Sequence, residues 1–74
     1  MKPSIGRIVH YVSYGTPGGE YTSECRAAVV TEVTDEKSVG LCVLNPTGEL
    51  FNRAVEQDEV DKRGGTWHWP EREA

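Results

Sequence analysis

Residues 25–44 read CRAAVVTEV-TDEK-SVGLCVL and decide the fold. Two runs rich in β-branched side chains, residues 25–33 and 38–44, flank the polar turn 34–37, a pattern typical of an antiparallel hairpin. The second run is the most apolar in the chain and indicates a central strand. In the first run one face is more apolar than the other, and we expect it to face the core. This face comprises Cys25, Ala27, Val29, Thr31 and Val33.

The β pattern continues on both sides of this hairpin. Residues 45–48, Asn-Pro-Thr-Gly, have the composition of a type I turn, and residues 49–55 return as a strand. Residues 6–12 predict a first strand, and residues 66–69, Thr-Trp-His-Trp, predict a last strand that Pro70 ends. No segment has a useful helical period. These runs predict an all-β fold, a small five-stranded SH3-like barrel with short loops.

Length and charge restrict the class of protein. The 74 residues suffice for one small domain, residues 1–74, in which we expect 71–74 to be a frayed tail. A net charge of −4 argues against general nucleic-acid binding, which needs a basic surface. No signal peptide and no run long enough to span a membrane is visible, so we expect an intracellular protein with reduced cysteines and no membrane association.

Histidine and cysteine are too widely spaced to form a metal motif. His10, Cys25, Cys42 and His68 are a permissible tetrahedral set for zinc, but no C-x2-C or H-x3-H pair occurs among them. We therefore assign no metal site and expect both cysteines to be small core hydrophobes. The chain also lacks a nucleophile motif, and the four acids within residues 56–61 are typical of a solvated face. We expect no cofactor and no enzyme activity.

Aromatic and arginine side chains are the candidates for ligand binding. Residues 14–21, Tyr-Gly-Thr-Pro-Gly-Gly-Glu-Tyr, resemble the first long loop of SH3-like barrels, a ligand-contact region. A phosphate cradle in this loop is a weak alternative because the P-loop ending is missing. Flat ligands stack on aromatic rings, and arginine pairs with anions. The candidate residues are Arg7, His10, Tyr11, Tyr14, Arg53, His68 and Trp69.

The last strand carries both tryptophans. Alternation places Trp67 and Trp69 on one face and His68 on the other. A core this small can take one indole and leave the second at the mouth of a barrel. Alternation in a closed barrel would otherwise turn both indoles inward or both outward. We therefore expect Trp67 to anchor the core, and Trp69, beside Pro70, to be available for binding.

Four segments together carry a resemblance to a known group. Residues 6–11, 25–31, 44–48 and 64–70 resemble small uncharacterised β-barrel-like proteins of actinobacteria and their bacteriophages, and the Thr-Trp-His-Trp-Pro ending is the most specific part. The resemblance brings no activity with it. It implies a phage setting, in which short accessory proteins bind host enzymes, assemble into virions or sequester small molecules.

These observations predict a non-catalytic, phage-type accessory protein. Its aromatic and arginine-lined surface would bind a small anionic, nucleotide-like ligand or a host or phage protein, in the host cytoplasm or in the virion. The first alternative is a structural virion or assembly component, a possible homo-oligomer that uses the same surface as its subunit interface. The second alternative is a small zinc protein or an enzyme.

Overall fold

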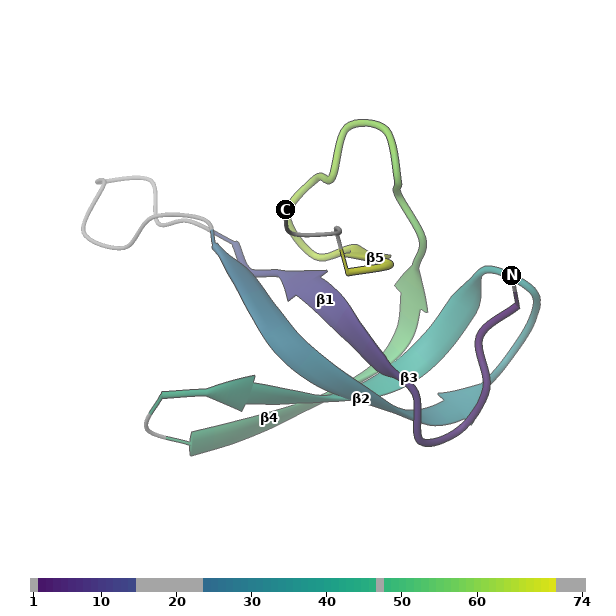
Figure 1. The fold of residues 1–74 in the computed structure, drawn as a ribbon, viewed down its shortest axis with the longest axis horizontal. Coiled ribbons are helices and arrows are strands. Elements are labelled where there is room, and N and C mark those ends of the chain that lie inside the picture. Colours follow the sequence, from purple (N-terminus) through teal and green to yellow (C-terminus); the bar gives the residue numbers. More distant parts are fainter. Residues whose placement is uncertain (1, 15–23, 47, 71–74) are drawn as a thin grey trace.

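Five antiparallel strands form one sheet in the computed structural model, which describes residues 2–14, 24–46 and 48–70 (Figure 1). The strands are β1 (Ile8–Val12), β2 (Cys25–Val33), β3 (Ser38–Asn45), β4 (Gly48–Glu56) and β5 (Trp67–His68). The predicted all-β class is confirmed. The described residues contain no helix, and thus none that is long and apolar enough to cross a membrane. The glycine-rich part of the predicted ligand loop, the tail 71–74 and Thr47 of the predicted turn lie outside the described residues.

The sheet has the order β4-β3-β2-β1-β5 and curls into a half-barrel (Figure 1). The β3–β4 register shifts between Val39 and Leu41, and Ala54 on β4 has a φ of 55°. Such a shift increases the local twist, and the left-handed conformation costs a residue with a Cβ about 1–2 kcal/mol. Beyond this bend Gln57 forms a parallel bridge with Trp67. The half-barrel is therefore drawn together at β5, which also pairs with β1.

Trp67 anchors the core, as predicted from its place on the last strand. Its side chain is fully buried, and its Nε1 donates a hydrogen bond to the Lys37 carbonyl oxygen at 2.8 Å. The remaining core residues come from the first four strands, and Trp69 packs against them while partly buried. They are Val9, Tyr11, Ala28, Val30, Val39, Leu41, Val43 and Val55.

The predicted core face of β2 is wrong. Ala28 and Val30 fill the core, whereas Val33 on the predicted face is 42% exposed. The core face looked polar in sequence because it also carries charged residues, but these lie toward the strand ends, where Arg26 pairs with Glu24 at 2.8 Å. Pairing with the buried residues of β1 and β3 decides which face turns inward, and sequence alternation does not contain that information.

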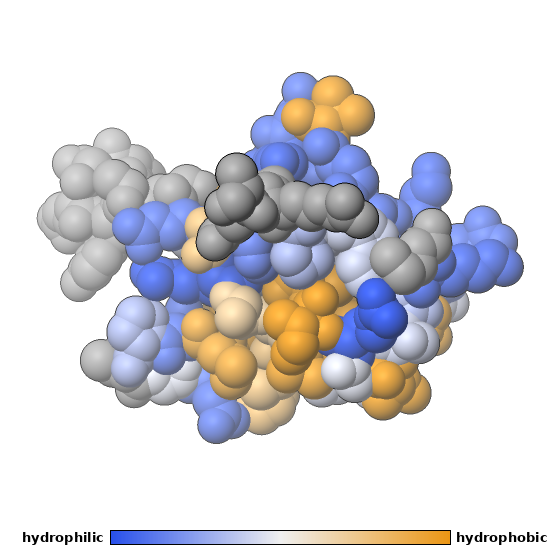
Figure 2. Space-filling model, in the orientation of Figure 1, coloured by the Kyte–Doolittle hydropathy of each residue, from blue (hydrophilic) through white to orange (hydrophobic). Residues whose placement is uncertain are grey.

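The two free cysteines consequently lie outside the core, contrary to prediction. Cys25 is exposed and Cys42 is half-buried, on the outer face of the sheet. An apolar row crosses this face through the successive partners Ile8, Val29, Cys42 and Phe51. Ile8 is 51% exposed and Phe51 68% exposed. Hydrophobic side chains also gather where the strands lie in the lower half of the molecule in Figure 2.

Candidate functional site

The seven predicted ligand-binding residues separate into three places. Three of them line a cleft at the end of the half-barrel, two stack on each other, and two form a histidine pair. The groups are Tyr11 with Tyr14 and Arg53, Arg7 with Trp69, and His10 with His68. The fold therefore does not bring the seven predicted residues together on one continuous surface.

The cleft has a volume of about 220 Å³ and lies between β1, the bend of β4 and the segment that enters β5. Its lining combines aromatic rings with an amide and a guanidinium group. Besides the three predicted residues, the lining includes Asn52, Ala54, Val55 and Gly65. Asn52 was not among the predicted residues, and strand alternation gives no signal for it, because neighbours on a regular strand point to opposite faces.

Tyr11 forms the buried part of the cleft wall. Its side chain is 5% exposed and shares a hydrogen bond with Asn52. Burial raises the pKa of the Tyr11 phenol, and nearby Tyr14 raises it further, while the Asn52 hydrogen bond lowers it. The phenol is therefore neutral at physiological pH and can donate a hydrogen bond within the cleft.

Arg53 brings the positive charge of the cleft and is already paired. Its Nε donates to Glu32 Oε1 at 2.8 Å and its Nη2 donates to Glu32 Oε2 at 3.2 Å. This bidentate contact lowers the pKa of the Glu32 carboxyl group. The Arg53 side chain is 83% exposed, so solvent screens the pair and an incoming anion competes with Glu32 at small cost.

Two residues of the cleft wall have positive φ. Ala54 lies at 55° and Gly65 at 84°. The Tyr14 ring occupies the space where a Cβ on Gly65 would project. Backbone strain at a residue other than glycine is concentrated at functional sites. Ala54, beside Asn52 and Arg53, has such a conformation, and so does Lys62 in the loop after β4, with a φ of 51°.

Trp69 and Arg7 contact each other through a cation–π interaction. The Arg7 Cζ lies 5.5 Å from the centroid of the Trp69 ring, within cation–π range. Trp69 also makes an edge contact with Trp67, with centroids 5.3 Å apart. The predicted stacking platform therefore already carries a guanidinium group.

The acidic segment after β4 shapes a loop. The Asp58 carboxylate accepts hydrogen bonds from Asp61 N at 3.0 Å, Arg63 N at 3.2 Å and Arg63 Nε at 2.6 Å. Glu59 Oε2 accepts from Gln57 Nε2 at 2.7 Å and from Trp69 N at 3.0 Å. An Asp that opens a turn and bonds the backbone ahead of it is a recognisable signal, which the solvated-face interpretation passed over.

Asp58→Asn should lower stability at neutral pH, with a difference from wild type that shrinks in acid. The Arg63 hydrogen bond, with the bonds from the backbone, holds the pKa of the Asp58 carboxyl well below its usual range. A depressed folded-state pKa stabilises the fold above the unfolded value of about 4, and this contribution is lost as the pH falls through the folded value. Urea midpoints at pH 7, 4 and 2 measure it.

Asp61→Asn is the control for this prediction. It removes the same charge from the same loop, but Asp61 contributes its backbone N–H to the Asp58 turn. Its urea midpoint at pH 7 should stay closer to wild type. Equal midpoints for Asp58→Asn and wild type at pH 7 would contradict the assigned role of Asp58.

The third place joins His10 and His68 to Cys25, which was not among the predicted ligand residues. The histidine rings meet edge to face with centroids 5.4 Å apart, and Cys25 Sγ lies 3.8 Å from His68 Nε2. Cys42 belongs to a different part of the sheet, where its Sγ lies 4.0 Å from Glu49 Oε2. Three members of the four-residue zinc set are thus adjacent and the fourth is not.

Comparison with known proteins gives no match to a family model, to a curated protein sequence or to a solved structure.

Proposed function

We propose that the protein is a non-catalytic binding module of the SH3-like barrel type whose cleft receives the planar ring of a nucleotide-like anion. The observation that carries this proposal is the convergence of Tyr11, Tyr14, Asn52 and Arg53 on one cleft. We further propose a phage-type accessory role, for which the resemblance of the sequence is the support.

The size of the cleft favours a single ring. Sites for drug-sized molecules usually measure about 300–1,000 Å³, and this cleft of about 220 Å³ is smaller. Tyr14 is 71% exposed and offers a ring face on which a base can stack, worth about 1–3 kcal/mol. The Asn52 amide and the Tyr11 hydroxyl supply hydrogen bonds to the edge of the ring.

The charge of the chain favours a small anion over a polyanion. A net charge of −4 repels a long nucleic acid, whereas one phosphate can exchange with Glu32 on the Arg53 guanidinium. The Arg53–Glu32 pair is exposed and screened by solvent, so an anion displaces Glu32 at a small cost in free energy.

A nucleotide titration followed by amide chemical shifts tests the proposal. We expect purine or pyrimidine mononucleotides to shift the amides of Tyr11, Asn52, Arg53 and Gly65 in a saturable manner. Arg53→Gln should weaken binding about tenfold through loss of a charge-assisted contact. Lys2→Gln, the matched control, removes the same charge from an exposed pair with Glu36 and should bind as wild type does. No saturable shift across the panel at millimolar nucleotide would exclude the proposal.

The apolar row favours assembly with a second copy of the chain as the other candidate function. Ile8 and Phe51 at its two ends are more than half exposed, and two copies of such a row are complementary to each other. Sedimentation equilibrium over a range of concentrations should then show a dimer that Phe51→Ser weakens. A monomer at all concentrations would reject this candidate.

A further inference from the structure

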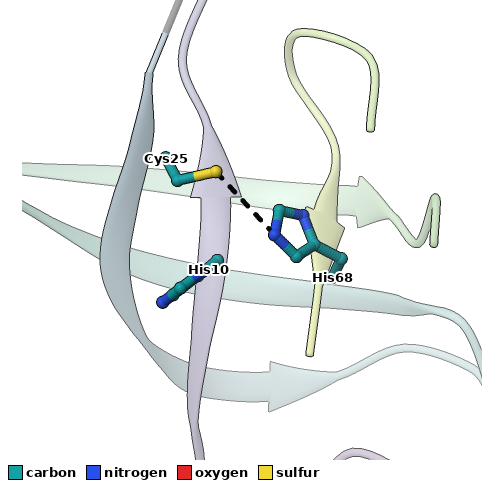
Figure 3. Close-up of side chains that lie close together, drawn as sticks. All are labelled: His10, Cys25 and His68. Atoms are coloured by element: carbon teal, nitrogen blue, oxygen red, sulfur yellow. Dashed lines mark hydrogen bonds between the residues drawn. The ribbon is translucent and has the colours of Figure 1, made fainter. Parts of the chain in front are cut away.

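The register of the sheet brings two histidines and a cysteine to one point on its outer face. His10 and His68 are direct partners in the β1–β5 ladder, where opposed Cβ atoms lie about 4.5–5.5 Å apart. Cys25 pairs with Val12 on the other side of β1, and Ala27, two residues later, pairs with His10. Since residues two apart share a face, Cys25 lies diagonally next to His10. Figure 3 shows the three side chains arising from neighbouring strands.

From this arrangement we propose that His10, Cys25 and His68 bind one zinc ion. Their ligand atoms all lie within 4.8 Å of one another. Zn–N and Zn–S bonds of about 2.0–2.3 Å require ligand atoms about 3.3–3.6 Å apart in a tetrahedron. The separation of 3.8 Å between Cys25 Sγ and His68 Nε2 is already near this value, and small rotations about the side-chain bonds close the rest.

A buried nitrogen supports the assignment independently of the spacing. His10 Nδ1 is inaccessible to solvent and has no hydrogen-bond partner among the described residues. A buried polar atom without a partner is destabilising, and a bond to a metal would offset that cost. Imidazole and thiolate together are the ligand types that zinc prefers, and no carboxylate belongs to the group.

The geometry leaves one coordination position for an outside ligand. The group has three members among the described residues, and zinc takes four ligands. His68 is fully buried and Cys25 is exposed, so the fourth position opens on the Cys25 side. Three protein ligands with one open position allow the ion to hold a water molecule or a donor atom from a partner.

Zinc at this position would also fasten β5 to the sheet. β5 is two residues long and has a short ladder with β1. A metal bound by β1, β2 and β5 ties three strands together at the point where the half-barrel is drawn together. We assigned no metal site from the sequence, because His10, Cys25 and His68 become neighbours only through the register of the sheet.

Titration of chelator-treated protein with Zn²⁺ and Co²⁺ tests the proposal. We expect one equivalent of zinc by elemental analysis after desalting. At free zinc a hundredfold above Kd, the melting temperature should rise by about 10–20 °C. Co²⁺ should give visible bands of a tetrahedral site and a thiolate charge-transfer band in the near ultraviolet. Absence of bound zinc, or of any change in melting temperature, would overturn the site.

Two cysteine variants identify the ligand. Cys25→Ser should abolish the charge-transfer band and weaken zinc binding at least a hundredfold. Because Cys25 is exposed, we expect this variant to fold. Cys42→Ser is the matched control and should retain both properties. Loss of the band in Cys42→Ser but not in Cys25→Ser would refute the assignment.

Retention of copper in preference to zinc, with a thiolate–copper band that depends on Cys25, would overturn the choice of metal. Arg53→Gln should leave zinc binding unchanged, which separates this site from the cleft.

Discussion

Replacing Trp67 with Ala should remove a large part of the stability of the fold at 25 °C. Trp67 is the largest fully buried side chain, and it holds Lys37 through its indole N–H. Truncation of a buried Trp to Ala typically costs about 3–5 kcal/mol. A domain of this size has roughly 4–11 kcal/mol of stability in total, so the substitution removes much of it. Far-ultraviolet circular dichroism and urea denaturation measure the loss.

Trp69→Ala is the matched control for this result. Trp69 follows β5, two residues after Trp67, and is only partly buried against the core. It should lose less stability than Trp67→Ala and should remain folded. If Trp67→Ala has the urea midpoint of wild type, or if the order of the two variants is reversed, the core does not depend on Trp67 as described.

Gly65→Ala should displace Tyr14 from the cleft and also destabilise the fold. A Cβ at this position would collide with the Tyr14 ring, which is exposed and can swing away. The φ of 84° adds a backbone cost of about 1–2 kcal/mol. Loss of the nuclear Overhauser contacts between the Tyr14 ring and residue 65 would report the displacement, and thermal denaturation would report the cost.

Two other glycines separate these causes. Gly6 has a φ of 91° and open space around a Cβ, so Gly6→Ala should carry the backbone cost without moving Tyr14. Gly48 has open space and no positive φ, so Gly48→Ala should be nearly neutral. If proposed nucleotide binding uses Tyr14, affinity should fall in Gly65→Ala alone. A Tyr14 ring that stays in place in Gly65→Ala would show that the cleft wall is more adaptable than its geometry implies.

The strands could be predicted from sequence because their signals are local. Alternating β-branched residues and the turn at 34–37 gave β2 and β3 nearly to the residue. The core role of Trp67 followed from the size of an indole relative to a small core. The core face of β2 could not be predicted in this way. The face that carries Ala28 looks polar in sequence because charged residues lie near the ends of the strand, where they form ion pairs.

The candidate sites depend on contacts between distant segments, which the sequence does not contain. The cleft lies between β1 and a bend in β4 at Ala54. The positive φ of Ala54 cannot be predicted from its residue type, because alanine rarely adopts it. The proposed zinc ligands become neighbours through the pairing of His10 with His68, which lie far apart in the sequence. Binding by these residue types stays a prediction, and their grouping in space could not be read without the register.

The place of β5 in the sheet has a consequence for how the chain folds. Local hairpins join β2 to β3 and β3 to β4, but the ladder of β1 with β5 joins segments from opposite ends of the chain. Contacts between residues far apart in the sequence slow folding, because the chain loses the entropy of loop closure before the compensating contacts form. Until β5 docks, β1 is an edge strand with unpaired N–H and C=O groups. We therefore expect the four-stranded meander of β1 to β4 to form early. Docking of Trp67 and β5 would then be the late step that covers the free edge of β1 and protects the chain from aggregation.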